Sequence, residues 1–377
     1  MKEVFIIADN IISPLGFSTA ENFQQLKQSV SGVQLHEDKK IADEPFYASL
    51  FPAGCELFMG DKYTHFEQLL IASIEATLSS ANLDITSKNT ILIISSTKGN
   101  ISLIETEENN EALRKRVALH TSAQLVADHF HFANKPLIVS NACISGLLGI
   151  VTGMRLIQSG IYENAVVVGA DVITKFVMSG FQSFQAVSAE PCKPFDADRT
   201  GINLGEGAAT IILSSNKQDA KSIKVTGGAT GNDANHISGP SRTGMELSHV
   251  LQKAVKEAGI QNADVDFISA HGTATMYNDE MESKAITIAG MEHTPVNSLK
   301  GYYGHTLGAA GLIESIITLQ QMKENLVIPT KGFQQLGVTK PVNVAANTII
   351  QKNLKHCLKI ASGFGGCNGA VVFSKAE

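Results

Sequence analysis

A cysteine at the predicted start of a buried helix is the first residue that could act as a nucleophile. Residues 136–146 read Pro-Leu-Ile-Val-Ser-Asn-Ala-Cys-Ile-Ser-Gly, which places Cys143 between an apolar strand ending at Val139 and a helix predicted from about Ala142 to Gln158. The unpaired N–H groups and the positive dipole end of a helix start favour a thiolate there. A free cysteine is also a small hydrophobic residue, so a structural role in the core stays an alternative.

Two histidines and a lysine lie in glycine-rich turns of the second half. His271 follows an apolar strand, and Lys300 and His305 precede a helix rich in Gly and Ala. Ligand sites in open α/β sheets gather at the carboxyl ends of strands, so both histidines are placed to face a cysteine at an equivalent junction. A single histidine is more often an ordinary core or surface residue, and only the joint placement favours a site.

A glycine loop near the end of the chain surrounds one phenylalanine. Residues 363–366 read Gly-Phe-Gly-Gly, so backbone N–H groups of the loop can bind an oxyanion and Phe364 can gate a channel. Glycine loops are also common turns, which makes this signal weak alone.

We expect no metal site and no disulfide framework, because metal-ligand spacings and C-x-x-C pairs are missing from the sequence. A reducing compartment fits this cysteine usage best.

Short apolar runs alternate with helical patterns throughout, which is typical of an α/β fold. A chain of 377 residues that is 44% hydrophobic and 18% charged can bury a large core, as two domains or one large α/β unit. Buried strands are predicted at Val4–Ala8, Ile91–Ile94, Leu137–Val139, Ala165–Val168, around Val225, and at Asp266–Ala270, Leu358–Ala361 and Ala370–Phe373.

We divide the chain at a polar stretch, residues 214–220, into two halves. Residues 1–215 carry the nucleophile, and residues 221–377 carry the histidines. The string at 205–214 resembles the string at 366–374, since each is a glycine turn followed by an apolar strand and a serine. This similarity is either chance or the trace of an internally duplicated pair of α/β units.

The charge balance limits the partners. Acidic residues outnumber basic ones 36 to 30, and this net charge of −6 argues against nucleic acid. The apolar run at the N-terminus is too short for a signal peptide or a membrane span, so we expect a cytoplasmic protein without a membrane partner. A local basic run holds Arg114, Lys115 and Arg116, with Lys62 as a further candidate. It directly follows an acidic run, so a self-paired solvated face is the alternative.

Six ordered motifs extend over nearly the whole chain, and together they resemble the elongating β-ketoacyl-acyl-carrier-protein synthases, which are condensing enzymes of the thiolase-like fold. The motifs are Ile12-Ser-Pro-Leu-Gly16, Ala142-Cys-Ile-Ser-Gly146, Pro194-Phe-Asp-Ala-Asp-Arg-Thr-Gly201 with Gly205-Glu-Gly207, Ala270-His-Gly-Thr-Ala-Thr275, Asn297-Ser-Leu-Lys300 with Gly304-His305, and Gly363-Phe-Gly-Gly366.

The resemblance implies a five-layer αβαβα architecture built from two similar halves, and a dimer. It implies that Cys143 is the nucleophile, that His271 and His305 are the catalytic histidines, and that Lys300 acts beside them with support from Glu314. An oxyanion would be held by the N–H groups of Cys143 and Phe364. The substrates would be acyl and malonyl thioesters on an acidic acyl carrier protein, without a metal or organic cofactor. The basic run would then dock the carrier.

Some residues depart from the family pattern and leave the substrate open. Cys367 stands where the family usually has threonine, and Gly301-Tyr302-Tyr303 replaces a small-residue stretch. Fatty-acid, type II polyketide and aryl polyene synthesis are all compatible with the motifs. A non-catalytic subunit resembling a chain-length factor is one alternative. A thiolase-type enzyme acting on coenzyme A thioesters is another, and a cysteine hydrolase is a third with less support.

Overall fold

The N-terminal half forms a mixed sheet of five strands. The computed structural model describes residues 2–52, 54–55, 57, 62–218, 222–234 and 239–376. Along this sheet the strand order is β5-β4-β6-β8-β1. The strands are β1 (Phe5–Ile12), β4 (Thr90–Ser95), β5 (Leu137–Val139), β6 (Asn164–Asp171) and β8 (Gly207–Ser214). Each apolar run predicted as a strand in this half lies in or overlaps one of them.

The C-terminal half repeats this arrangement. Its strands follow the order β11-β10-β15-β16-β9, with a short β13 (Asn343–Val344) beyond β11. In both halves the first two pairings are parallel and the last two are antiparallel. The strands are β9 (Ile223–Asn232), β10 (Phe267–Ser269), β11 (Pro295–Asn297), β15 (His356–Gly363) and β16 (Cys367–Lys375). The expectation of two similar halves is confirmed, and the two similar sequence strings lie at β8 and β16, which occupy equivalent places.

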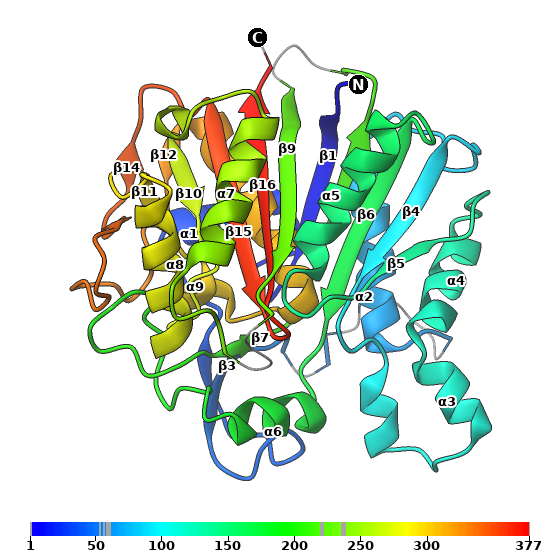
Figure 1. Ribbon diagram of the computed structural model, residues 1–377. Helices are drawn as coiled ribbons and strands as arrows, with labels where there is room; N and C mark the ends of the chain where they lie inside the picture. The colour runs from blue at the N-terminus through cyan, green and yellow to red at the C-terminus, as the bar shows by residue number, and fades with distance from the viewer. Residues whose placement is uncertain are drawn as a thin grey trace.

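The two sheets are joined where β1 pairs with the start of β9. Phe5 is opposite Lys224 and Ile6 is opposite Ile223, so the strands form one eleven-stranded run across the molecule (Figure 1). The predicted boundary at 215–221 falls between β8 and β9. Residues 219–221 of that boundary lie outside the described residues. The division itself therefore stays a prediction.

Helices form three layers around these sheets. The central layer is made of α5 (Ser145–Gln158) and α10 (Ala310–Glu324), which contact each other. The outer layers are α2 (His65–Leu78) with α4 (Leu119–His129) on the N-terminal sheet, and α7 (Met245–Glu257) with α8 (Met276–Ile288) on the C-terminal sheet. This gives the expected five-layer αβαβα order.

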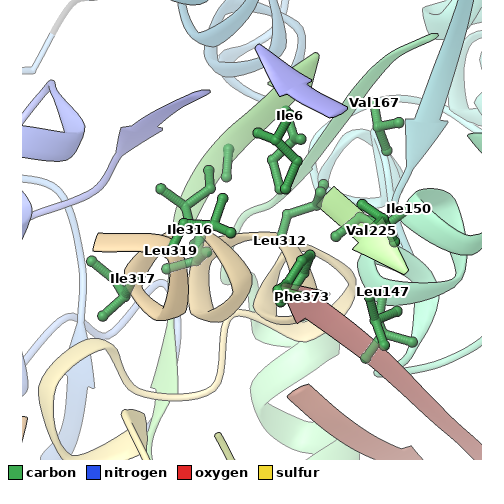
Figure 2. Packing of buried hydrophobic residues seen from close by; sticks show 14 of the residues in the cluster. Ile6, Leu147, Ile150, Val167, Val225, Leu312, Ile316, Ile317, Leu319 and Phe373 are labelled. Atoms are coloured by element: carbon green, nitrogen blue, oxygen red, sulfur yellow. The ribbon is translucent and has the colours of Figure 1, made fainter. Parts of the chain in front are cut away.

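Strand alternation separates the apolar cores of these layers. Ile93 and Val167 belong to the central core, whereas their neighbours Leu92 and Val168 belong to the core under α2 and α4. Figure 2 shows the central core, where Leu312 and other side chains of α10 lie close to side chains from strands of both halves. The central helices are therefore buried from two sides.

Glycines at the starts of α5 and α10 bring these helices into close contact. A Cβ at Gly146 would lie 2.8 Å from the carbonyl oxygen of Gly308, and one at Gly311 would lie 2.9 Å from Leu147 Cβ. Real Cβ atoms do not approach so closely, so both positions require glycine. The contact places the turn before α5, which includes the nucleophile candidate, beside the loop before α10.

Smaller elements gather mainly around the ends of the sheets, and α6, α3, β3 and β7 lie at the end away from both termini (Figure 1). No helix among the described residues is both long enough and apolar enough to cross a membrane. The remaining elements are α1 (Thr19–Lys27), β2 (Gln34–His36), β3 (Phe46–Ser49), the 3₁₀ turns η1 (Ile101–Glu105), η2 (Asn262–Asp264) and η3 (Leu307–Ala309), α3 (Glu111–Val117), α6 (Lys175–Ser183), β7 (Leu204–Gly205), α9 (Lys300–Tyr303), β12 (Leu326–Val327) and β14 (Ile349–Ile350).

Candidate active site

Cys143 lies in a tight turn between β5 and α5. The helix begins at Ser145, later than the predicted start at Ala142, and Ala142 has a left-handed φ of 43°. That conformation is unfavourable for a residue with a Cβ. The Ser145 hydroxyl holds the turn, because it accepts from Asn141 N at 2.8 Å and donates to Ala142 O at 2.7 Å. Cys143 is therefore fixed just before the helix and not in its first turn.

The thiol of Cys143 is protonated at neutral pH. Burial, followed by the nearby Cys367, raises its pKa to about 12, although Lys300, Lys98 and the N–H of Phe364 act in the opposite direction. The expectation of a resting thiolate is therefore not met. A thiolate in this buried site loses more hydration than the neighbouring charges and N–H groups replace. The thiol needs a proton acceptor during reaction.

His271 and His305 supply neutral nitrogens beside this thiol. The sulfur of Cys143 and a ring nitrogen of each histidine lie within 4.8 Å of one another, and the two rings are 5.0 Å apart at 82°. Burial first, and then the charge of Lys300, hold the pKa of both imidazoles well below 6.5. His271 Nδ1 and both ring nitrogens of His305 are buried without a hydrogen-bond partner among the described residues. They are free to bind a substrate.

Two buried lysines share one carboxylate behind the histidines. Lys300 Nζ donates to His271 O at 3.0 Å and to Glu314, as the sequence-based expectation of a supporting Glu314 requires. The second lysine, Lys359 on β15, lies 2.6 Å from the other oxygen of Glu314. Lys359 was not singled out from the sequence. It could have been, because it is a charged residue inside an apolar strand, and a buried charge almost always has a partner.

Two carboxyl groups of α8 were also missed, and they hold the loop that carries His271. Glu282 accepts from the backbone N–H groups of His271 at 2.7 Å and Gly272 at 2.6 Å, and Asp279 accepts from Thr273 N at 2.9 Å. Burial raises the pKa of Asp279 to about 6 and that of Glu282 to about 7. Both act on the loop backbone, and neither touches a ring nitrogen.

A pocket of about 250 Å³ opens onto Cys143, His271 and His305. Aromatic side chains line part of it: the Phe364 ring stacks on Phe181 with centroids 5.6 Å apart and lies 5.2 Å from Phe184. Phe364 is 37% exposed, so its ring is at the pocket wall and not locked in the core. This placement agrees with the predicted gate.

Cys367 lies close to the nucleophile candidate but faces backbone carbonyls. Its sulfur is 3.4 Å from Phe364 O and 3.7 Å from Asn141 O. Burial raises its pKa to about 11, so Cys367 is a protonated thiol.

Three of the four residues predicted to dock the carrier, Arg114, Lys115 and Arg116, lie on α3, and Lys62 lies shortly before α2. Both terminal nitrogens of Arg116 donate to the buried Glu67, so Arg116 has a structural partner inside the protein. Lys115 pairs with Glu111 at an exposed position. Arg114 contacts Asn109, and Lys62 lies over the Tyr63 ring. Arg114, Lys115 and Lys62 are the members left for a partner.

The thiol and the two imidazoles are close enough together to ligate a metal ion. Their surroundings oppose this, because the charges of Lys300 and Lys359 lie next to the histidines. A divalent cation would meet electrostatic repulsion there. The same positive surroundings favour an anionic group, such as a carboxylate or an enolate.

Two sequence models of one protein family cover most of the chain. Beta-ketoacyl synthase, N-terminal domain, matches residues 1–219, and Beta-ketoacyl synthase, C-terminal domain, matches residues 223–334. The 3-oxoacyl-[acyl-carrier-protein] synthase 2 of Vibrio cholerae is 28% identical over 99% of both chains. A putative polyketide beta-ketoacyl synthase 1 of Streptomyces halstedii is 29% identical over 70% of this chain and 66% of its own length.

Solved structures agree on the fold. A ketosynthase in complex with its chain length factor from Xenorhabdus doucetiae superposes with a TM-score of 0.89 at 23% identity, covering 100% of this chain and 98% of that one. The ishigamide ketosynthase/chain length factor gives 0.90 at 22% identity, covering 100% of both chains. With the family models spanning both halves, these findings show that the chain belongs to the β-ketoacyl synthase family, the condensing enzymes of the thiolase-like fold.

Proposed function

We propose that the protein condenses a malonyl group, carried by an acyl carrier protein, with an acyl group held on Cys143. The observation that supports this proposal is that one buried thiol lies next to two neutral imidazoles. Nitrogens of both imidazoles have no hydrogen-bond partner among the described residues. A hydrolase would need a group that activates water, whereas the positive charges of Lys300 and Lys359 beside these histidines favour the binding of a substrate anion. Fatty-acid, type II polyketide and aryl polyene synthesis all use this chemistry.

In the first half-reaction the Cys143 sulfur attacks the acyl thioester. The thiol proton moves to a neutral histidine nitrogen and then to the leaving carrier thiolate, while the sulfur–carbon bond to the acyl group forms. The N–H groups of Cys143 and Phe364 bind the oxyanion of the tetrahedral intermediate. The Phe364 N–H is near enough to the Cys143 thiol to lower its pKa. The Phe364 ring gates entry of the acyl chain.

In the second half-reaction the malonyl thioester loses CO2. The bond to the carboxylate breaks, and its electron pair moves into an enolate whose oxygen accepts hydrogen bonds from His271 and His305. The enolate carbon attacks the acyl carbonyl, and the sulfur–carbon bond to Cys143 breaks. The product stays on the carrier, and the returning sulfur takes up a proton from the solvent. Lys300 and Glu314 support the histidines from behind.

We further propose an acyl carrier protein and a second, identical or related subunit as partners. Among proteins of the same fold, one solved structure pairs a type II polyketide acyl-carrier protein with its ketosynthase, and another holds a chain length factor. In this chain β5 is the last described strand of its sheet, and Leu137 on it is 39% exposed. Such an edge can pair with another chain. A cytoplasmic location stays a prediction.

The decisive test is covalent loading followed by mass measurement of the intact protein. Wild type incubated with acyl carriers of different chain lengths should gain one acyl group, mapped to Cys143 by peptide analysis, and should then release a β-ketoacyl product with malonyl carrier. Cys143→Ala should do neither, whereas the control Cys55→Ala should do both. Condensation by Cys143→Ala near the wild-type rate would overturn the mechanism. Loading from coenzyme A thioesters alone would favour the thiolase alternative.

A further inference from the structure

Lys359 is buried on the inner face of a strand whose alternate residues face a different core. Leu358 and Ile360 belong to the core under α7 and α8, whereas Cys357 and Ala361 belong to the central core. Alternation therefore points Lys359 toward the central layer, where α10 carries Glu314. The side chain of Lys359 has no exposed surface, and its hydration must be replaced by protein groups.

The contacts of Lys359 complete a pattern begun by Lys300. Lys359 Nζ donates to Ser269 O at 3.2 Å and Ala270 O at 2.9 Å, and Lys300 Nζ donates to His271 O at 3.0 Å. Three consecutive carbonyls, from the end of β10 into the catalytic loop, thus accept from lysines. The two lysines also occupy both oxygens of Glu314. One strand end, one carboxylate and two cations form a single buried cluster.

The charges of this cluster do not cancel. Burial lowers the pKa of Lys359 and the adjacent Glu314 raises it, while the three acceptors around Lys359 Nζ, two carbonyls and Glu314, match the three donors of an ammonium group. Lys300 and Lys359 then bring two positive charges, and Glu314 between them brings one negative charge. Glu282, a further carboxyl near Lys359, has a pKa raised to about 7, so it is only partly ionised at neutral pH. Lys300 alone would be neutralised by Glu314. The excess positive charge behind the histidines therefore depends on Lys359.

We propose that Lys359 is a positioning residue whose charge keeps the cluster behind His271 and His305 positive, and so promotes decarboxylation of the malonyl substrate. The inference rests on the proposed function and adds a residue to it. Positive charge at this place keeps the imidazoles neutral, as donors of hydrogen bonds, and stabilises the developing enolate. The charge of Lys359 lowers the pKa of both histidines. Acyl transfer to Cys143 develops no charge at the enolate position, so its rate depends less on the charge of Lys359.

The test separates the two half-reactions in charge variants. Lys359→Met and Lys359→Gln should each slow malonyl decarboxylation by about 10- to 100-fold, less than the roughly 10²–10³ typical for losing a direct oxyanion donor. Acyl loading on Cys143 should stay within a few-fold of wild type in both. Lys359→Gln is the sharper variant, because the new amide can still donate to a carbonyl but carries no charge. The exposed Lys352→Met is the matched control.

A double variant tests the charge count directly. Lys359→Met with Glu314→Gln restores one net positive charge, on Lys300, and should decarboxylate faster than Lys359→Met alone. Wild-type decarboxylation in the Lys359→Gln variant, equal loss of loading and decarboxylation in folded variants, or no recovery in the double variant would each overturn the inference. Failure of the proposed function looks different, because wild type itself would then not decarboxylate the malonyl carrier.

Discussion

At the scale of single residues, the two histidines should serve one half-reaction more than the other. His271→Ala and His305→Ala each remove a donor to the enolate, so malonyl decarboxylation should fall by about 10²–10³. Acyl loading on Cys143 should fall less, because the oxyanion of that step lies on backbone N–H groups and the remaining histidine beside the thiol can still accept its proton. Mass measurement of acyl-enzyme and of released CO2 in the same variants provides the comparison. Equal collapse of both steps would contradict this division of roles.

Single residues also show how far the sequence could predict this site. Cys143 and His271 were predictable because each follows a strand in a turn of small residues, and such turns gather at one end of a sheet. His305 was predictable because it stands in a glycine-rich turn before a helix. The protonation state of Cys143 was not predictable, because it is decided by burial in the folded protein, which no local sequence pattern shows. Lys359 was missed for a similar reason, since its partner Glu314 lies on a different element, α10, far from β15 in sequence.

At the scale of elements, the contact between α5 and α10 should control the reactivity of the nucleophile. Gly311→Ala places a Cβ against the backbone at Leu147, so the two helices must separate. We expect a loss of about 1–3 kcal/mol in the free energy of unfolding, as for other overpacked cores. Acyl loading on Cys143 should also slow, because the turn before α5 moves with the helix.

The matched control for that variant lies in α6. A Cβ at Gly180 would contact nothing within 4 Å, and this glycine has no positive φ. Gly180→Ala should therefore leave the stability unchanged or raise it by about 0.5–1 kcal/mol through helix propensity. Chemical denaturation compares both variants with wild type. If Gly311→Ala is as stable and as reactive as Gly180→Ala, the tight helix contact has no role in placing Cys143.

A second contact between elements, the ion pair of α2 with α3, predicts a pH dependence of stability. Burial alone would raise the pKa of Glu67, but hydrogen bonds from Arg116 and its neighbours lower it from 4.5 to about 2. Since the folded-state pKa is depressed, the pair stabilises the protein above pH 4.5, and this contribution is lost as the pH falls through 2. Arg116→Met should cost about 2 kcal/mol or more at pH 7 by leaving Glu67 buried and unpaired.

The measurement for this pair is denaturation of wild type and Arg116→Met between about pH 7 and pH 3. The difference in the free energy of unfolding should shrink as the pH falls, because Glu67 becomes protonated in folded Arg116→Met, where burial raises its pKa without the opposing Arg116, at a higher pH than in folded wild type, where its pKa is about 2. Lys115→Met, on the same helix but exposed, serves as the control and should show no such trend. A difference that stays constant with pH would mean that Arg116 stabilises the protein by packing and not by its charge.

The same elements show why the two similar halves could be predicted from the sequence, whereas the way in which they bring the catalytic residues together could not. The strings around β8 and β16 hinted at duplicated halves, and the matching strand orders confirm them. Equivalent junctions, however, carry different chemistry: the turn before α5 holds Cys143, and the loop before α10 holds His305. Their meeting depends on how the two central helices pack, which requires Gly146 and Gly311 together. No local pattern in the sequence contains that information.

At the scale of the whole molecule, a protein of net charge −6 has to attract a carrier that we propose to be acidic. Association with such a carrier then requires a local positive surface. The candidate residues for this surface are Arg114, Lys115 and Lys62. Complementary charges mainly speed association and set orientation. The attraction weakens with salt, since the screening length is about 8 Å at physiological ionic strength.

Arg114→Glu with Lys115→Glu should therefore raise the apparent KM for carrier-bound substrates several-fold at low salt and much less at high salt. Arg116 is left in place, because its ion pair with Glu67 would confound binding with stability. Reaction with a small thioester that lacks the carrier should be unchanged. Lys253→Glu with Lys256→Glu, at exposed positions of α7, applies the same change of charge elsewhere. If both double variants raise KM equally, the effect is one of net charge, and the carrier does not dock on α3.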